Sequence, residues 1–375
     1  RGLPLMLRGK QVVIAGDRQQ LQPYDLYQTR LQAEEEETME VEIDSLLEMA
    51  AQYFPTYHLQ THYRSATLPL IDFSNRNFYK GKLYMLPDRK VLNSGDHGLK
   101  LIKVEGVWKD QTNIQEAEEV MAQLQSARAI NPSDSIGIIT FNYHQMMLIS
   151  SLIEEDELLC QDEKIRVKNI ENVQGDEFDQ VIFSVGYARN LEGKFTANFG
   201  LLSRKGGENR LNVAITRARK RNVLISSLKM SDFRERHMKN AGIRLLKEYL
   251  AFVDEVQQGT ATLALRPDAP GYDRNWSFRD RLIGNYGSHE VVENPYSAVM
   301  DLEVNENGKA VAAILTDDQR FFSSKTAKEA FVYHPRLLSS RNWNIVFLFS
   351  RQYWLDKEDL LQTKLAQVKS QSGEG

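Results

Sequence analysis

Short apolar runs alternate with longer segments of helical periodicity between residues 99 and 226. Leu99–Val104 and Ser135–Thr140 have the length and composition of buried strands, while Asn113–Ile130 and Gln145–Glu155 repeat apolar residues at helical spacing. This order of strand, helix, strand and helix predicts a doubly wound α/β sheet. Further strands are predicted at Ile165–Ile170, Val181–Val185 and Asn222–Ser226.

Length and composition limit the class of protein. A chain of 375 residues is too long for one ordinary core, so two or three domains are expected. The sequence has no apolar run of about 18 residues and no signal-peptide pattern, so we expect no membrane span and a cytoplasmic or nuclear location. The single cysteine, Cys160, excludes a disulfide framework and a cysteine zinc site.

The net charge of −4 does not by itself indicate nucleic-acid binding. The charge is unevenly distributed, however, with acidic runs at Glu34–Glu37 and Glu154–Glu157 and basic runs at Arg217–Arg221 and Lys80–Lys82. Local patches decide where phosphates bind, so a nucleic-acid partner stays open.

The stretch Asn209–Ser226 places Arg217 and Arg219 after the apolar run Leu211–Ile215 and before a predicted strand. A guanidinium group is permanently charged and is shaped to bind phosphate oxygens, which suits phosphoryl transfer. Taken alone, the stretch fits a solvated basic helix end equally well.

Four ordered stretches resemble the motifs of superfamily 1 helicases, closest to the subgroup of the nonsense-decay helicase and its DNA-processing relatives. They are AGDRQQLQP (Ala15–Pro23) for motif III, LQTHYRS (Leu59–Ser65) for motif IV, NVQGDEFDQVIFS (Asn172–Ser184) for motif V and VAITRAR (Val213–Arg219) for motif VI. The resemblance implies a RecA-like parallel-sheet domain, the second of a P-loop NTPase, in an ATP-dependent helicase.

The resemblance also implies roles for individual residues at an ATP site. Arg217 and Arg64 would be catalytic and reach the γ-phosphate, and Gln20 would sense that phosphate. Nucleotide binding would involve Gln174, Gly175, Glu177 and Arg219. Without the resemblance, Lys10–Ala15 is a short strand followed by a turn that Asp17 caps, and Gln174–Glu177 is an acidic turn before a strand.

The segment IGIITFNYHQ (Ile136–Gln145) resembles the family's contact with the nucleic-acid backbone. Thr140, Asn142 and Gln145 are the expected contacts, and the resemblance implies that the partner is DNA or RNA, single-stranded in the helicase core. A second segment, Leu68–Tyr84, interleaves aromatic and basic residues that could stack on bases. Packing in the core is the preferred interpretation of that aromatic stripe.

The phosphate-binding pattern GxxxxGK[ST] is absent from the sequence. In helicases this loop precedes motif III, so the chain is expected to be a carboxyl-terminal fragment that begins inside the first RecA-like domain. ATP with Mg²⁺ would need that preceding part as a partner in cis, and the chain alone would be inactive.

The region after the glycine- and proline-rich stretch Gln257–Tyr272 has a different pattern. A helix is predicted at Ser277–Asn285, with strands at Glu290–Asn294, Val299–Val304, Ala310–Thr316 and Asn344–Phe349. Asp301, Ala312–Ala327 and Asn342–Trp354 resemble the small α/β domain of very-short-patch-repair endonucleases, a branch of the PD-(D/E)xK restriction-endonuclease fold.

Cleavage by such enzymes needs two or three carboxylates around Mg²⁺. Asp301 fits the first position, but Leu315 stands where relatives have a glutamate. Asp317 and Asp318 are only weak substitutes, so no metal site is expected. The alternatives are a binding scaffold that keeps a decayed nuclease fold and an active metal-dependent nuclease.

The expected domain boundaries follow from these patterns: 1–47 for the end of the first RecA-like domain, 48–256 for the second, 257–275 for a linker, 276–360 for the nuclease-like domain and 361–375 for a flexible end.

Overall fold

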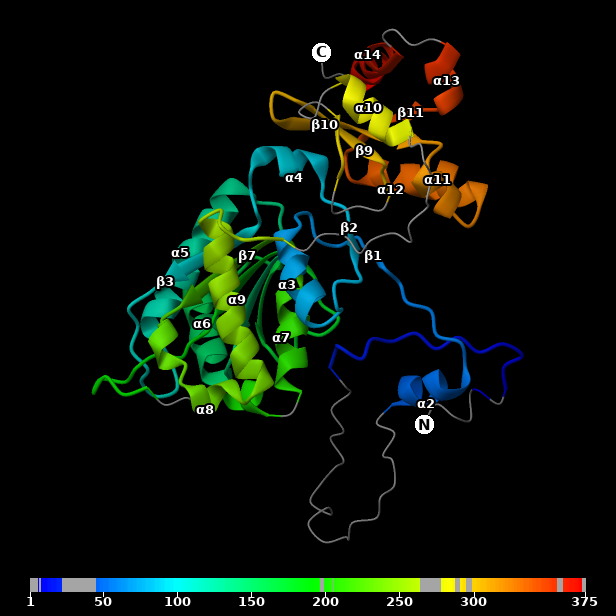
Figure 1. The fold of residues 1–375 in the computed structure, drawn as a ribbon. Coiled ribbons are helices and arrows are strands. Elements are labelled where there is room, and N and C mark those ends of the chain that lie inside the picture. The colour runs from blue at the N-terminus through cyan, green and yellow to red at the C-terminus, as the bar shows by residue number, and fades with distance from the viewer. Residues whose placement is uncertain are drawn as a thin grey trace.

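The computed structural model describes residues 6, 8–21, 45–195, 199–204, 206–263, 278–286, 291–294, 299–355 and 360–372. They form a large sheet domain, residues 61–257, and a smaller tail domain, residues 278–372, above it in Figure 1. The acidic run Glu34–Glu37 and most of the predicted linker, from residue 264 to residue 275, lie outside the described residues.

The sheet domain contains a five-stranded sheet in which every pairing is parallel. Its strands are β3 (Leu99–Lys103), β4 (Ile136–Thr140), β5 (Ile165–Asn169), β6 (Phe178–Ser184) and β7 (Ala218–Ser226), in the order β3-β7-β6-β4-β5. The α/β fold predicted from the sequence is therefore confirmed. Because the chain crosses from β5 back over β4 to β6, a crevice is expected outside the carboxyl ends of β4 and β6.

Helices cover both faces of this sheet. They are α3 (Pro69–Asn77), α5 (Ile114–Ile130), α6 (Tyr143–Glu155), α7 (Gly207–Ile215) and α9 (Ala241–Gln257). Three shorter helices are α2 (Leu46–Tyr53), which lies apart from the sheet in Figure 1, α4 (Arg89–Ser94), which contacts the tail domain, and α8 (Glu235–Met238). Two 3₁₀ turns span Gly200–Ser203 and Met230–Asp232. A separate two-stranded parallel pair consists of β1 (Thr61–His62) and β2 (Tyr84–Met85).

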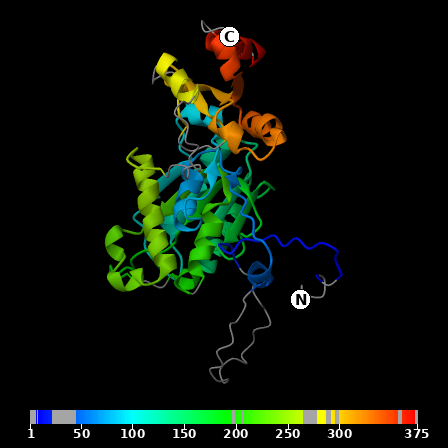
Figure 2. The same ribbon diagram turned by 45° about the vertical axis from the view of Figure 1, so that its right-hand side comes forward.

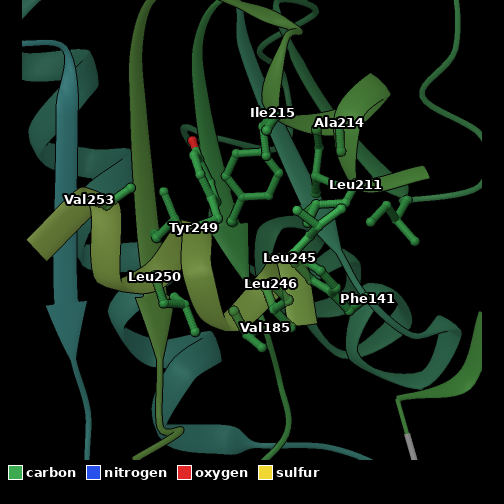
Figure 3. Close-up of a cluster of buried hydrophobic side chains, with 14 of the residues drawn as sticks. Phe141, Val185, Leu211, Ala214, Ile215, Leu245, Leu246, Tyr249, Leu250 and Val253 are labelled. Carbon is green, nitrogen blue, oxygen red and sulfur yellow. The ribbon is translucent and has the colours of Figure 1, made fainter. Parts of the chain in front are cut away.

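Successive side chains of a strand point to opposite faces, and the strands supply two cores accordingly. Val181 and Phe183 pack on the side of α3, α7 and α9, whereas Ile182 packs on the side of α5 and α6. Figure 3 shows the first core, to which α7 contributes Leu211, Ala214 and Ile215 and α9 contributes Leu246, Tyr249 and Leu250. Leu70, Phe73 and Phe78 of the aromatic stripe are buried there too, so its packing interpretation is confirmed.

The tail domain is a mixed four-stranded sheet with helices around it. Its strands are β8 (Val291–Val292), β9 (Leu302–Glu306), β10 (Lys309–Thr316) and β11 (Asn344–Leu348); β8, β9 and β10 are antiparallel neighbours, and β11 pairs parallel to β10. The helices are α10 (Phe278–Tyr286), α11 (Gln319–Ser323), a π-helix (Glu329–Tyr333) that continues into α12 (His334–Ser340), α13 (Ser350–Leu355) and α14 (Leu360–Ser372).

Two expectations are wrong. The strand predicted at Lys10–Ala15 does not form: within the described residues this segment pairs with no strand, and Val13 is 84% exposed. The flexible end expected at 361–375 is helix α14 over most of its length, and Leu361 and Leu365 are buried in the tail core. An apolar run forms a strand only where another strand pairs with it, and residues 10–15 have no such neighbour among the described residues. A weakly amphipathic helix such as α14 is stabilised by packing against a core.

Candidate functional site

The arginine stretch and the turn Gln174–Glu177 meet at one edge of the sheet. The turn immediately precedes β6, Arg217 immediately precedes β7, and these strands are parallel neighbours that pair Phe178 with Ala218. The amide of Phe178 donates to the carbonyl oxygen of Arg217 at 3.0 Å. Strand pairing thus brings together two segments that are about 40 residues apart in the sequence.

Arg217 is a buried cation with neutral partners. Its side chain donates from Nε to the carbonyl oxygen of Val213 (2.7 Å), from Nη1 to that of Asp176 (3.1 Å) and from Nη2 to Thr216 Oγ1 (3.1 Å). Only 4% of the residue is exposed. Burial, followed by the nearby charge of Arg64, lowers the pKa of Arg217 to about 10, so it stays charged at neutral pH. None of the described residues forms an ion pair with it, which leaves a positive charge for an anion to neutralise.

Arg64 and Arg219 share one carboxylate. Arg64 Nε lies 3.0 Å from Glu177 Oε2, and Arg219 Nη2 donates to Glu177 Oε1. All three side chains are partly exposed, so each pair contributes little stability. With Arg217, three arginines face one carboxylate, a local net charge of +2. We call Arg64, Arg217, Arg219 and Glu177 the arginine cluster.

The segment before Arg64 is held by a neutral histidine. The amide of Ser65 donates to His62 Nε2 at 3.1 Å, and the Ser65 hydroxyl lies 2.9 Å from the same nitrogen. Burial and the charges of Arg64 and Arg341 lower the pKa of His62 to about 3. His62 is therefore an uncharged acceptor at neutral pH, and Arg64 Nη1 reaches the carbonyl oxygen of Thr216 at 3.4 Å.

The predicted motif III turn contacts this side of the sheet domain. Gln174 Nε2 donates to the carbonyl oxygen of Leu21 at 3.3 Å, and Asn212 Nδ2 donates to that of Gln19 at 2.9 Å. The amide group of Gln20 bonds within its own turn, to Asp17 Oδ2 at 3.1 Å, rather than toward the arginines. All four resembling stretches therefore lie around one region of the molecule.

Gly175 and Tyr79 complete this region. Gly175 has φ +89°, where a side chain would be strained, although a Cβ atom would meet nothing within 4 Å. Tyr79 donates to Asp17 Oδ2 at 2.8 Å, and burial, with smaller contributions from its neighbours, raises its pKa to about 12. Tyr79 and Asn212 were not predicted as site residues, since a polar residue on a helix and a tyrosine in an apolar stripe have no distinctive pattern.

Thr140, Asn142 and Gln145 lie at the opposite, carboxyl edge of the sheet. Thr140 and Gln145 have no exposed surface, so their side chains do not reach a nucleic acid in this conformation. Asn142 is half-buried and caps α6 by accepting from the Gln145 amide at 2.8 Å. Its Nδ2 group has no hydrogen-bond partner among the described residues.

Gln145 belongs to a buried network around Glu116. Gln145 Nε2 donates to the carbonyl oxygen of Asn113 (2.9 Å) and to Ser184 Oγ (3.1 Å). Glu116 accepts from the Ser184 hydroxyl (3.0 Å) and from the amides of Gly186 and Ser227 (both 2.7 Å). Burial raises the pKa of Glu116 to about 7 despite these bonds. No sequence pattern points to Glu116, because a glutamate in the first turn of a helix is usually solvated.

The weak metal candidates of the tail domain are already bonded. Asp301 is 7% exposed, and its Oδ2 accepts from the Thr316 amide (2.7 Å) and from Arg320 Nε (3.0 Å). Asp317 accepts from the amide and hydroxyl of Ser350 at 2.7 and 2.6 Å. Among the described residues, no three His, Cys, Asp or Glu side chains are grouped to hold a metal ion. In the same parts of the chain, every helix is too short or too polar to cross a membrane.

Comparison with known proteins gives one family match and several similar proteins. Residues 43–229 match the AAA domain family. The matched residues include the whole arginine cluster and the sheet that positions it.

Two proteins are similar to nearly the whole chain. An uncharacterized ATP-dependent helicase of Mycoplasma pneumoniae is 30% identical over 96% of this chain and 35% of that protein. An uncharacterized ATP-dependent helicase of Mycoplasma genitalium is 34% identical over 95% of this chain and 34% of that protein. The chain spans about a third of the length of these curated relatives. A solved structure, the C-terminal domain of a possible DNA helicase from Lactobacillus plantarum, matches 44% of this chain and 86% of that one at 16% identity with a TM-score of 0.27, too low to support an argument.

Proposed function

We propose that this chain supplies the arginine side of an ATP site in an ATP-dependent helicase or translocase. The observation that carries the proposal is Arg217, a buried cation without an acidic partner, grouped with Arg64 and Arg219 at one edge of an AAA domain. Permanently charged, forked side chains are suited to the charge that spreads over a transferring phosphoryl group. The phosphate loop would come from another domain, because none of the 375 residues provides that pattern.

Each residue of the cluster has a part in this proposal. Arg217 and Arg64 would stabilise the γ-phosphoryl charge, and Gln20 would sense its presence after turning away from Asp17. Glu177 would hold Arg64 and Arg219 in place until the nucleotide binds. Gln174 and Gly175 would bring backbone amides close to the nucleotide. Mg²⁺ would arrive with ATP.

We also propose a nucleic-acid contact at the carboxyl edge, with single-stranded DNA or RNA as partner. The support is the Nδ2 donor of Asn142, which is buried beside Gly186 and has no hydrogen-bond partner among the described residues. It lies at the carboxyl ends of β4 and β6, where a crevice is expected, and a phosphate would reach it when Asn142 and Gly186 separate. Tyr143, 58% exposed, adds a ring on which a base can stack. Thr140 and Gln145 would shape this turn from inside.

A third proposal concerns the tail domain, which we propose to be a restriction-endonuclease-like fold that binds nucleic acid or a protein without cutting. Its support is the four-stranded mixed sheet together with Asp301, whose carboxylate is paired with Arg320. This pair occupies the position where the first metal ligand was expected.

Substitution of the arginines tests the ATP-site proposal. In the full-length protein, Arg217→Ala and Arg64→Ala should each lower kcat for ATP hydrolysis by roughly 10³-fold, the loss expected for such a residue. The matched control is Arg221→Ala, which removes an arginine of the same stretch whose partner is Asp96. Turnover unchanged by Arg217→Ala would contradict the proposal.

Asn142→Asp tests the nucleic-acid contact. This change keeps the oxygen that caps α6 and replaces the Nδ2 donor with a negative charge. Affinity for a fluorescent oligo(dT) should fall by about tenfold or more, the scale of one charged hydrogen bond. Asn240→Asp, at the cap of α9, adds the same charge elsewhere and should leave binding unchanged.

A further inference from the structure

One short segment of the sheet domain packs against the tail domain and is hydrogen-bonded to it. Leu86–Asn93 follows β2 in the sheet domain, yet Leu86 is buried in a core formed otherwise by the tail domain, including Trp343. Its hydrogen bonds to the tail include Arg89 N to Arg341 O (3.0 Å), Arg89 Nε to Asn342 O (2.5 Å), Asn342 Nδ2 to Asp88 Oδ2 (2.6 Å) and Trp343 Nε1 to Pro87 O (2.9 Å). The Asn93 side chain also donates to and accepts from the Ala310 backbone, at 2.8 Å each. We call Leu86–Asn93 the docking segment.

The docking segment is also bonded to the arginine cluster. The amide of Asp88 donates to the carbonyl oxygen of Ala66 at 2.9 Å, and the amide of Ala66 donates to that of Arg219 at 2.7 Å. Ala66 lies two residues after Arg64, so its backbone connects Asp88 to both exposed arginines of the cluster. An unbroken series of hydrogen bonds therefore runs from Asn342 of the tail to Arg219.

Strand pairing gives a second connection between the docking segment and the arginine cluster. β2 leads directly into the docking segment and pairs with β1, which leads directly into Arg64. The amide of Tyr84 donates to the carbonyl oxygen of Gln60 at 2.7 Å. A two-residue strand has little stability of its own, so β1 depends on how β2 is held. Figure 1 shows this pair between the sheet domain and the tail, and Figure 2 shows the tail above the sheet domain from a second side.

The tail also contributes charge near the cluster. Arg341, one residue before Asn342, acts with Arg64 and with burial to lower the pKa of His62. His62 in turn accepts the amide of Ser65, next to Arg64. Backbone, strand pairing and charge thus connect the same two regions.

We infer that the tail domain controls the geometry of the arginine cluster and that Asn342 is a positioning residue for it, an inference that rests on the proposed ATP site. With the tail docked, Asp88 holds Ala66, and Ala66 holds the strand start that carries Arg219. When the tail moves away, Arg64 and Arg219 lose this support. A ligand of the tail that favours one position of the domain would change ATP turnover through the same bonds.

The pair Asn342 and Asp88 permits a sharp test. Asn342 has φ +59°, a conformation that aspartate also tolerates, so Asn342→Asp changes charge without new backbone strain. It places a second carboxylate against Asp88. Asp88→Asn combined with Asn342→Asp exchanges donor and acceptor, and asparagine still caps α4 as Asp88 does through the amides of Lys90 and Val91. The combined variant should restore docking.

Hydrogen exchange of this chain measures the coupling without any ATP. In Asn342→Asp, the amide of Ala66 should exchange roughly tenfold faster, as expected when a charged hydrogen bond is lost, while amides of β4 and β6 keep their rates. The combined variant should return Ala66 to its original rate. Trp343→Phe, which removes the bond to Pro87, should act in the same direction as Asn342→Asp. Unchanged exchange at Ala66 in both single variants, whatever happens at Arg89, would overturn the inference.

Turnover of the full-length protein then separates this inference from the proposed function. Asn342→Asp should lower kcat roughly tenfold, in proportion to the lost bond, and leave KM for ATP within about twofold, with recovery in the combined variant. If Arg217→Ala abolishes hydrolysis but Asn342→Asp has no effect, the inference fails alone. If Arg217→Ala has no effect, the proposed function fails, and exchange at Ala66 still decides whether the tail and cluster are coupled.

Discussion

Glu177 limits how much positive charge the arginine cluster presents. It accepts from both Arg64 and Arg219, whereas Arg217 bonds to neutral oxygens. A phosphate that binds at the proposed ATP site would therefore have to compete with one carboxylate for two guanidinium groups. The two exposed arginines are held in place by that carboxylate, and the buried one is held by the protein backbone.

Glu177→Gln should strengthen anion binding to this chain. Removing one negative charge a few ångströms from the ligand favours an anion by about tenfold at low salt. Inorganic tripolyphosphate, titrated calorimetrically at low and high ionic strength, is a suitable probe. Asp96→Asn removes a carboxylate from another arginine pair, with Arg221, and serves as the control. Equal affinity in Glu177→Gln and the unaltered chain would show that Glu177 does not oppose phosphate.

Glu116 should make stability depend on pH. Its pKa is raised from 4.5 to about 7 by burial, so between these values the folded protein keeps a proton that the unfolded chain releases. Its stabilising contribution is complete below pH 4.5 and falls as the pH rises to about 7, by roughly 3 kcal/mol for such a shift. Glu116→Gln should lack this decrease. Free energies of unfolding from urea titrations at pH 5, 6 and 7.5, compared between the two proteins, measure it.

His62 changes the pH dependence of stability in the opposite direction to Glu116. The quantity to compare is therefore the difference in free energy of unfolding between the original protein and Glu116→Gln at each pH. Its pKa is lowered to about 3, and the unfolded chain takes up a proton that the folded protein excludes as the pH falls below about 6.5. That contribution is present in both the original protein and Glu116→Gln and therefore cancels. If the two proteins differ by the same amount at all three pH values, the pKa of Glu116 is not raised.

At the scale of elements, β10 decides whether the tail domain can cut nucleic acid. Leu315 on this strand is buried in the core, and Asp301 beside it is paired with Arg320. A divalent cation would have to displace that arginine and would gain one carboxylate. Incubation of this chain with plasmid DNA and Mg²⁺ or Mn²⁺ should therefore give no cleavage. Cleavage that Asp301→Asn abolishes would mean that Asp317 or Asp318 completes a metal site.

The same ion pair should be important for folding of the tail. Asp301→Ala leaves Arg320 without its carboxylate in the interior, which typically destabilises by about 3–5 kcal/mol. Replacing both residues, Asp301→Ala with Arg320→Met, should recover most of that loss. Thermal unfolding monitored by tryptophan fluorescence measures both effects. A double variant no more stable than Asp301→Ala would show that the buried charge is not the cause.

Helices and strands were predicted best from the sequence where a local pattern, such as a continuous apolar run, identifies the element by itself. Buried parallel strands such as β4 and β6 are continuous apolar runs, and their predicted positions agree with the structure within a few residues. Strands β1 and β2, two residues each, have no such signal. The burial of Gln145 was also hidden, because its partners Asn113 and Ser184 come from different elements and are polar themselves.

At the scale of the molecule, the sequence predicted two bodies but not how they are joined. The partners Asp88 and Asn342 are 254 residues apart, and nothing in either segment identifies the other. The docking segment also has no motif, since backbone groups make much of the contact. Motif order located the arginine cluster, whereas the connection between tail and cluster required the fold.

The whole chain should hydrolyse no ATP on its own. Three arginines can bind phosphates, but the sequence has no GxxxxGK[ST] loop whose backbone amides and lysine hold the β- and γ-phosphates in line for transfer. Without that positioning, charge stabilisation has no ordered substrate to act on. Single-turnover measurements with radiolabelled ATP and oligo(dT) should match a boiled control, and Arg217→Ala should change nothing. Hydrolysis above the control that is lost in Arg217→Ala would mean that these residues form a complete ATP site by themselves.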